Sequence, residues 1–238
     1  MNDERKDRLD PRAVLLLLGC CATWGLAQVA AKVSLAEVPP LMQASVRSLG
    51  AAVLLALWAH WRGLPLWQRD GSHRAGLLLG LLFAAEFACL FIGLQHTSAS
   101  RMVVFLYSAP FFVALGMPLL LRTERLDRVQ VLGLLAAFAG VAWAYSEGFG
   151  ATKAGPMQWL GDALGLAGAA LWALTTLALR GSVLSRALPE KTLMYQLLVS
   201  AVALGLAAVL AGEVMPTQLS PAAGWGLALR KGAAQCHD

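Results

Sequence analysis

Glu86 is the residue whose position most clearly indicates chemistry. It lies near the middle of the apolar run GLLLGLLFAAEFACLFIGL, with no basic residue one or two helical turns away. A carboxylate inside a membrane segment is costly, so it usually faces a cavity or a partner. Glu86 is therefore a candidate for proton coupling or for contact with a cationic substrate. The alternative is a protonated glutamic acid that hydrogen-bonds a neighbouring helix.

A second group of candidates comes from an internal repeat. The segment LLLLGCCATWGLAQVAAK, moved 148 residues along the chain, falls without a gap on ALGLAGAALWALTTLALR. This shift places Trp24 on Trp172 and Gln28 on Thr176, and in each copy the two residues share one helix face. A tryptophan deep in a membrane segment needs a polar partner or a wet cavity for its indole N–H. These four residues are candidates for a substrate pocket, with ordinary core packing as the alternative.

Three basic residues are candidates for the mouths of such a pocket. Lys32 and Arg180 are repeat equivalents that end their apolar segments, and Arg47 follows Pro39 and Pro40 near Lys32. They either extend toward the membrane surface, with a favourable helix-dipole contact, or act as gates at opposite sides. A mouth of this kind would suit anionic or zwitterionic metabolites.

The segment HTSASRMVVFLYSAPFFVALGMPLLL contains two prolines inside one expected span. A proline in a membrane helix frees backbone carbonyls and bends the helix, often where binding or motion occurs. Pro110 is therefore a candidate for gating, and Tyr107, one turn earlier, is a candidate substrate-binding residue.

Enzyme chemistry and metal binding find no support in the sequence. It contains no HExxH, GxSxG, P-loop or DxD pattern, and its four histidines are scattered. The four cysteines show no CxxC or Cys/His spacing, and we interpret them as packing residues. We expect no enzyme activity, no cofactor and no metal site.

The composition indicates where these residues must lie. The chain is 58% hydrophobic and 14% charged, and Leu, Ala and Gly dominate its apolar runs. A spanning helix needs about 20 mostly apolar residues. The sequence therefore predicts an all-α, polytopic transmembrane helix bundle. Its expected spans are residues 13–32, 44–61, 75–95, 102–121, 129–146, 158–179 and 193–212.

The basic residues predict the orientation of this bundle. The N-terminal tail and every second link between spans carry thirteen of the nineteen basic residues. Because cytoplasmic links carry an excess of Lys and Arg, we expect a cytoplasmic N-terminus. The net charge of +5 then needs no nucleic acid to explain it.

The repeat predicts the domain organisation. Five spans form the first copy, and an odd number of spans makes the two copies enter the membrane from opposite sides, as in many secondary transporters. The second copy contains only two spans and the start of a third, because Arg230 and Lys231 fall where Leu82 and Phe83 lie in the first copy. We expect seven spans of ten, as in a truncated or frameshifted chain. The expected parts are a tail (1–12), a first repeat (13–146), an incomplete second repeat (158–229) and an aberrant polar tail (230–238).

These features together resemble the EamA-like family of the drug/metabolite transporter superfamily. The matching pieces include WG at 24–25, HTSAS at 96–100, YSAPFF at 107–112, TERLDRVQVLGLLAAFAGVAWA at 123–144 and ALWAL at 170–174. The resemblance implies a ten-helix transporter of two inverted five-helix repeats in a bacterial inner membrane. Such proteins typically export amino acids, related metabolites or toxic compounds, often in exchange for protons.

We therefore expect a secondary transporter that exports small metabolites or drugs by alternating access, inactive as this chain if its second repeat is incomplete. The alternative is a non-transporting membrane protein that acts only as an oligomeric or interaction component, for instance as a homodimer. A seven-helix receptor or membrane enzyme is disfavoured by the inverted repeat. The sequence leaves open the substrate, the coupling ion, the direction of transport and the oligomeric state.

Overall fold

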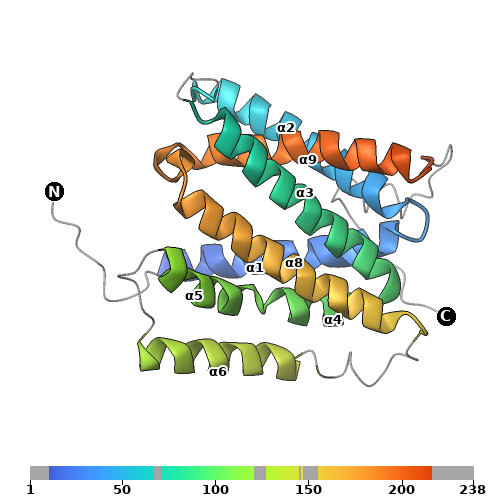
Figure 1. Ribbon diagram of the computed structural model, residues 1–238, viewed down its shortest axis with the longest axis vertical. Helices are drawn as coiled ribbons and strands as arrows, with labels where there is room; N and C mark the ends of the chain where they lie inside the picture. Colours follow the sequence, from blue (N-terminus) through green and yellow to red (C-terminus); the bar gives the residue numbers. More distant parts are fainter. Residues whose placement is uncertain (1–10, 67–70, 121–126, 145, 147–154, 216–238) are drawn as a thin grey trace.

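A computed structural model of the chain describes residues 11–66, 71–120, 127–144, 146 and 155–215. All regular secondary structure in these residues is helical, as Figure 1 shows. The helices are α1 (Pro11–Ser34), α2 (Pro40–Trp61), α3 (His73–His96), α4 (Ala99–Leu106), α5 (Ala109–Leu120), α6 (Arg128–Ala144), α8 (Gln158–Arg180), the 3₁₀ helix η1 (Val183–Arg186) and α9 (Pro189–Leu210).

The prediction of a polytopic helical bundle is confirmed. Each expected span coincides with a helix, or with a pair of helices in the case of residues 102–121. Five segments of the described chain are long and apolar enough to cross a membrane, and α6 contains a shorter apolar stretch, Val129–Trp143. The five are α2, α3, the α4–α5 segment up to Pro118, α8 and α9.

The fourth expected span is broken rather than bent. Residue Tyr107 ends α4 and α5 starts at Ala109, with a turn between them. Pro110 is the second residue of α5. A proline is tolerated there, because the first N–H groups of a helix have no intrahelical acceptor. In the interior of one continuous helix, the same proline would remove a hydrogen bond and disrupt the helix. The Ser108 hydroxyl donates to the carbonyl of Phe105 at 2.6 Å within the turn.

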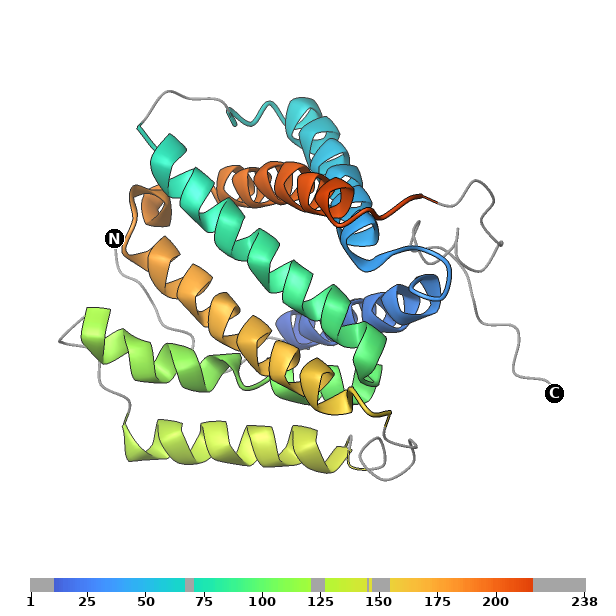
Figure 2. The same ribbon diagram turned by 45° about the vertical axis from the view of Figure 1, so that its right-hand side comes forward.

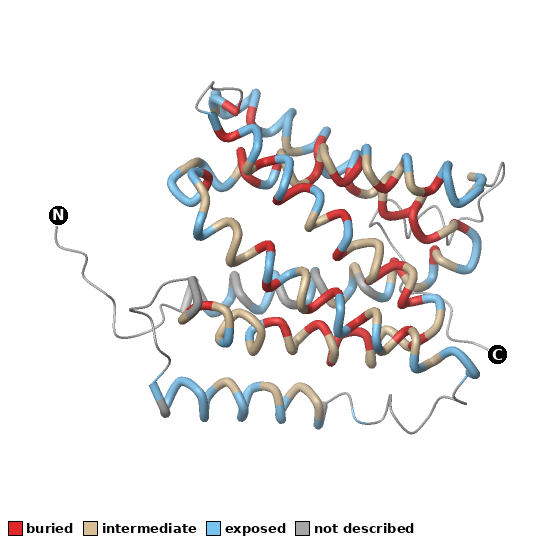
Figure 3. Tube along the Cα trace, viewed as in Figure 1, coloured by how far each residue is buried: buried red, intermediate tan, exposed pale blue. Residues whose placement is uncertain are grey.

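Helix α3 lies at the centre of the bundle. Helix α8 packs along one side of it and α9 along another, while α2 packs on α9 and α3. Figures 1 and 2 show α4 and α5 beside α8, with α6 beyond them at the edge. None of the described side chains of α6 is buried, as the tube in Figure 3 shows.

Glycines permit the close approach of α3 to its neighbours. A Cβ atom added at Gly76 would lie 2.5 Å from the ring of Tyr195 on α9. One added at Gly161 of α8 would lie 2.8 Å from the backbone nitrogen of Thr97, just beyond α3. Such small residues let membrane helices pack tightly where water supplies no hydrophobic drive.

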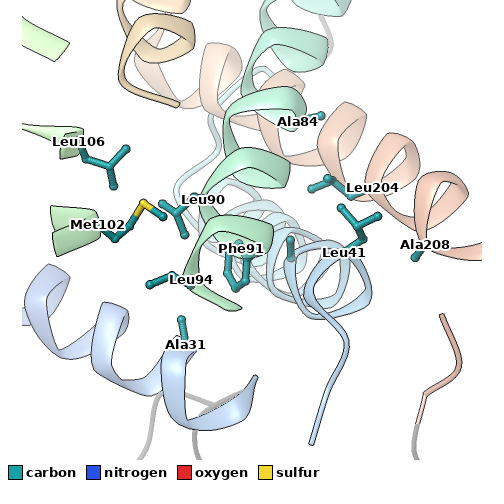
Figure 4. Close-up of a cluster of buried hydrophobic side chains, with 11 residues drawn as sticks. Ala31, Leu41, Ala84, Leu90, Phe91, Leu94, Met102, Leu106, Leu204 and Ala208 are labelled. Atoms are coloured by element: carbon teal, nitrogen blue, oxygen red, sulfur yellow. The ribbon is translucent and has the colours of Figure 1, made fainter. Parts of the chain in front are cut away.

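The largest buried apolar cluster joins five helices. Figure 4 shows Ala31 of α1, Leu94 of α3 and Met102 of α4 approaching one another, with Leu204 of α9 on the other side of α3. Large apolar side chains also cover the outside of the bundle; Leu210, for example, is 88% exposed. An apolar exterior around a compact interior is the pattern expected of helices that face lipid.

Candidate functional site

A cavity of about 380 Å³ lies between six helices of the bundle. It is bounded by α3 and α8 over most of its length and by α1, α2, α4 and α9 elsewhere. Its volume falls within the range of small-molecule sites. The lining residues are Ala27, Ala31, Arg47, Phe83, Glu86, Phe87, Leu90, Phe91, Leu106, Trp172, Thr175, Thr176, Leu179 and Gln196.

Three phenylalanines of α3 form one wall of this cavity. Phe83, Phe87 and Phe91 are four residues apart, so they follow one another along a single helix face. Their ring centroids lie 4.4 Å apart for the first pair and 6.0 Å apart for the second. An aromatic wall of this kind favours a ligand with an apolar part.

Glu86 is the acidic residue of the lining and is buried, with 6% of its surface exposed. Its carboxylate has no hydrogen-bond partner within the described residues, whereas the hydroxyl groups of Thr175 and Thr176 in the same lining bond to backbone carbonyls. Thr175, for instance, donates to the carbonyl of Leu171 at 2.9 Å. Because an unpartnered buried carboxylate is costly, Glu86 is the lining group with the most to gain from a ligand or a proton.

Arg47 and Gln196 place further polar groups in the lining, from α2 and α9. Arg47 comes from the first half of α2 and Gln196 from the first half of α9. The cavity thus combines a carboxylate, a guanidinium and an amide with a mostly apolar wall. This arrangement can bind a small molecule that carries both polar and apolar parts.

A second hollow of about 330 Å³ adjoins the cavity at the break between α4 and α5. It shares Leu106, Trp172 and Thr176 with the main cavity and adds Tyr107 and Pro110. The proline break therefore opens space beside the cavity, next to the indole of Trp172.

The structure brings most of the predicted site residues together. Glu86, Arg47, Trp172 and Thr176 line the main cavity, and Tyr107 and Pro110 line the adjoining hollow. Trp24 and Gln28 lie on α1, and their side chains fall outside the described part of the structure. Their functional roles remain predictions.

Lys32 and Arg180 contact neighbouring helices instead of lining the main cavity. The Lys32 ammonium donates to the carbonyls of Leu94 and Thr97, the latter at 2.8 Å, where α3 ends. It thereby satisfies carbonyls that a helix C-terminus leaves without intrahelical donors. The Arg180 guanidinium lies 3.8 Å from the sulfur of Met117 on α5.

An ion pair at the same end of α3 was not predicted from the sequence. The Arg101 guanidinium, in the first turn of α4, binds the carboxylate of Asp162, in the first turns of α8, through two nitrogens. The Thr97 hydroxyl donates to the same carboxylate at 2.8 Å. The sequence did contain a signal for this pair: Arg101 and Asp162 have opposite charges and lie near the starts of two helices that are expected to begin on the same side of the membrane. Among the described residues, no group of His, Cys, Asp and Glu is arranged to hold a metal ion.

Gln196, Thr175 and the phenylalanine row were also missed as lining residues. The spacing of the phenylalanines by four was visible in the sequence, and it marks one face of a helix. No comparable signal distinguishes Gln196, because a single polar residue in an apolar helix does not show which neighbour it faces.

Comparisons with known proteins find relatives of similar sequence and a structure of similar fold. The chain is 32% identical to an uncharacterized transporter of Synechocystis sp. and to the uncharacterized transporter YvbV of Bacillus subtilis, over 73% and 71% of its length. It spans 54% of each of these relatives, about half their length. A crystal structure of a protein with 21% sequence identity shares the fold, with a TM-score of 0.65 over 89% of this chain and 71% of the other.

The family assignment rests on the first five expected spans. The model of the EamA-like transporter family matches residues 11–146, which include α1 to α6 and therefore Glu86, Arg47 and the break at Pro110. This match covers more than half of the chain. The chain belongs to the EamA-like transporter family.

Proposed function

We propose that the protein exports a small metabolite, such as an amino acid or a related compound, or a drug, across the bacterial inner membrane. Transport takes place by alternating access at the 380 Å³ cavity. The observation that carries the proposal is the lining of this cavity: helices from both copies of the sequence repeat surround one buried carboxylate.

The position of the cavity between the repeat copies supports alternating access. Ala27, Arg47 and Glu86 come from the first copy, and Trp172, Thr176 and Gln196 come from the second. In transporters built from inverted repeats, the substrate site lies at the interface of the two copies near the membrane midplane. Rocking one copy against the other would then expose the cavity to each side in turn.

Within this proposal, each polar group of the lining has a role. Glu86 binds either the coupling proton or a cationic group of the substrate, because its carboxylate has no partner among the described residues and is buried. Arg47 faces an anionic group, and the phenylalanine row holds the apolar part of the substrate. By the distribution of basic residues, the end of the bundle where α8 finishes at Arg180 faces the cytoplasm.

Reconstitution in proteoliposomes tests the proposal. We would measure exchange of radiolabelled amino acids and accumulation driven by a pH gradient, for the parent chain and for Glu86→Gln. If Glu86 couples transport to protons, this variant keeps substrate exchange and loses accumulation, because exchange needs no proton movement. If Glu86 binds a cationic substrate instead, both activities fall.

Glu37→Gln is the matched control, because Glu37 is exposed in the turn after α1 and lies outside the cavity lining. Unchanged exchange and accumulation in Glu86→Gln would overturn the assigned role of Glu86. A stably inserted parent chain that exchanges no tested compound would instead favour a non-transporting membrane component, with a homodimer as the first assembly to test.

A further inference from the structure

We propose that Thr97, Arg101 and Asp162 form a polar lock that closes one end of the cavity and must open in each transport cycle. The inference rests on the proposed transport function and adds to it the identity of one gate. We call the end of the bundle where α3 finishes and α8 begins the Thr97 end, and the opposite end the Arg180 end.

On α8, the cavity lining lies toward the Arg180 end. Along α8, its lining starts at Trp172, fourteen residues after the first residue Gln158 and thus about 21 Å along the helix. It continues to Leu179, directly before the last residue of α8. On α1 and α3, by contrast, the lining reaches Ala31 and Phe91, which lie three and five residues before these helices end at the Thr97 end. Packed protein about 5–8 Å thick therefore closes the cavity at the Thr97 end.

That packed protein has an apolar layer and a polar layer. Leu94 and Met102 are fully buried and do not line the cavity. Figure 4 shows them next to Ala31 of α1, which does line it. At this level α3 and α8 cross closely, because a Cβ atom added at Gly161 would lie 2.9 Å from the carbonyl oxygen of Gly93. A crossing this close leaves no room for a solute to pass while the two helices remain in contact.

The polar lock lies on the outside of this layer and holds α8 against α3 and α4. The carboxylate of Asp162 on α8 accepts hydrogen bonds from two nitrogens of Arg101 on α4 and from the hydroxyl of Thr97 at the end of α3. The two charged side chains are only 15% and 16% exposed. Two-point pairs between arginine and a carboxylate are stronger and more directional than single contacts.

Thr97 also links the lock to α1. While its hydroxyl binds Asp162, its backbone carbonyl accepts a hydrogen bond from Lys32. Helices α1, α3 and α8 thus meet at Thr97, and α4 joins them through the pair of Arg101 with Asp162. For the cavity to open at the Thr97 end, α8 must leave α3 and α4, and the Arg101–Asp162 pair must break.

Labelling of a cavity cysteine tests the lock without any knowledge of the substrate. In a background whose four cysteines are replaced by alanine, Thr176→Cys places a thiol in the cavity lining. A membrane-impermeant maleimide is then applied to intact cells and, separately, to inverted vesicles. Gln95→Cys and Ser185→Cys, both exposed and at opposite ends of the bundle, show which preparation presents which end.

With the lock intact, we expect labelling of Thr176→Cys from the Arg180 end and at most a tenth of that rate from the Thr97 end. Asp162→Asn or Arg101→Gln should raise labelling from the Thr97 end about ten-fold. The charge exchange Arg101→Asp with Asp162→Arg should restore most of the slow rate. Arg186→Gln, an exposed arginine change at the Arg180 end, should have no effect.

Two results would overturn the lock. One is equal labelling of the parent chain from both ends, and the other is no increase in the two lock variants while Gln95→Cys reacts normally. Each variant must elute as a single species in detergent. If Asp162→Asn does not, Arg101→Lys serves instead, because it keeps the charge, loses the two-point contact and should give a smaller increase. A lock that controls labelling in a protein without transport activity would refute the proposed function and leave the lock standing.

Discussion

The crossing of α3 and α8 at Gly161 should not accept a single methyl group. A Cβ atom at this position would lie 2.8 Å from both the Cβ and the backbone nitrogen of Thr97, and 2.9 Å from the carbonyl oxygen of Gly93. Ordinary contacts start at 3.4 Å, so the helices would have to separate by about 0.6 Å. Two of these three neighbours are backbone atoms, which cannot turn away as a flexible side chain can.

The size of the expected loss of stability follows from comparison with a helical glycine that has free space around it. Replacing glycine by alanine inside a helix favours the helix by about 1 kcal/mol, and this gain applies equally to Gly161 and to Gly50 of α2. A Cβ atom at Gly50 would meet nothing within 4 Å. Overpacking in a tight interior costs about 1–3 kcal/mol. We therefore expect Gly161→Ala to be less stable than Gly50→Ala by about 1–3 kcal/mol.

Thermal unfolding in detergent, followed by size-exclusion chromatography, measures this difference. For a chain of this length, it corresponds to an apparent Tm lower by roughly 2–12 °C for Gly161→Ala than for Gly50→Ala. Equal Tm values for the two variants, or a higher value for Gly161→Ala, would refute the close crossing. The described packing of α8 on α3 would then be wrong at the Thr97 end.

Two further predictions concern contacts of α9 and the segment after it. The Glu213 carboxylate accepts hydrogen bonds from the backbone N–H groups of Leu41 (3.2 Å) and Met42 (2.7 Å) at the start of α2. Glu213→Ala should therefore lower the free energy of unfolding by about 0.5–2 kcal/mol, as loss of a helix N-cap does. Glu213→Gln should lower it less, and unfolding in detergent measures both. Tyr195→Phe removes the hydrogen bond to the imidazole of His73 (2.9 Å) but keeps the ring against α3, so it should lower the apparent Tm less than Tyr195→Ala does; equal losses would mean that the ring contributes nothing.

The positions of the helices could be predicted because hydropathy alone requires them. A segment that crosses lipid must be long, apolar and helical, since its backbone finds no other hydrogen-bond partners. The helix ends were less predictable. Helix α9 begins at Pro189, four residues before the expected span, because Glu190 and Lys191 in its first turn are charged but still helical. Hydropathy therefore marks the membrane-crossing part of a helix and not its full length.

Part of the candidate site could also be predicted, for a different reason. Glu86 stands out because a carboxylate in an apolar segment is costly and usually faces a cavity or a partner, and Trp172 was identified through the repeat. The partners of Lys32 could not be inferred, because a charge at the end of an apolar run does not show which carbonyls it meets. The pairing of Arg101 with Asp162 likewise depends on how α4 and α8 pack, and these residues are 61 positions apart.

The cavity exists because α3 packs against α8 and α9 on separate parts of its surface and leaves the part between them uncovered. Small residues bring both neighbours close to this helix: Gly80 approaches Val199 of α9, and Gly93 approaches the backbone of α8 at Gly161. Helices α8 and α9 pack along α3 but hardly meet each other, so the sector of α3 between them, which carries Glu86, faces open space. Substitutions on α3 should therefore fall into two groups: larger residues at the glycines move the cavity walls and lower stability, whereas changes at Glu86 alter what the cavity holds and leave the helix packing intact.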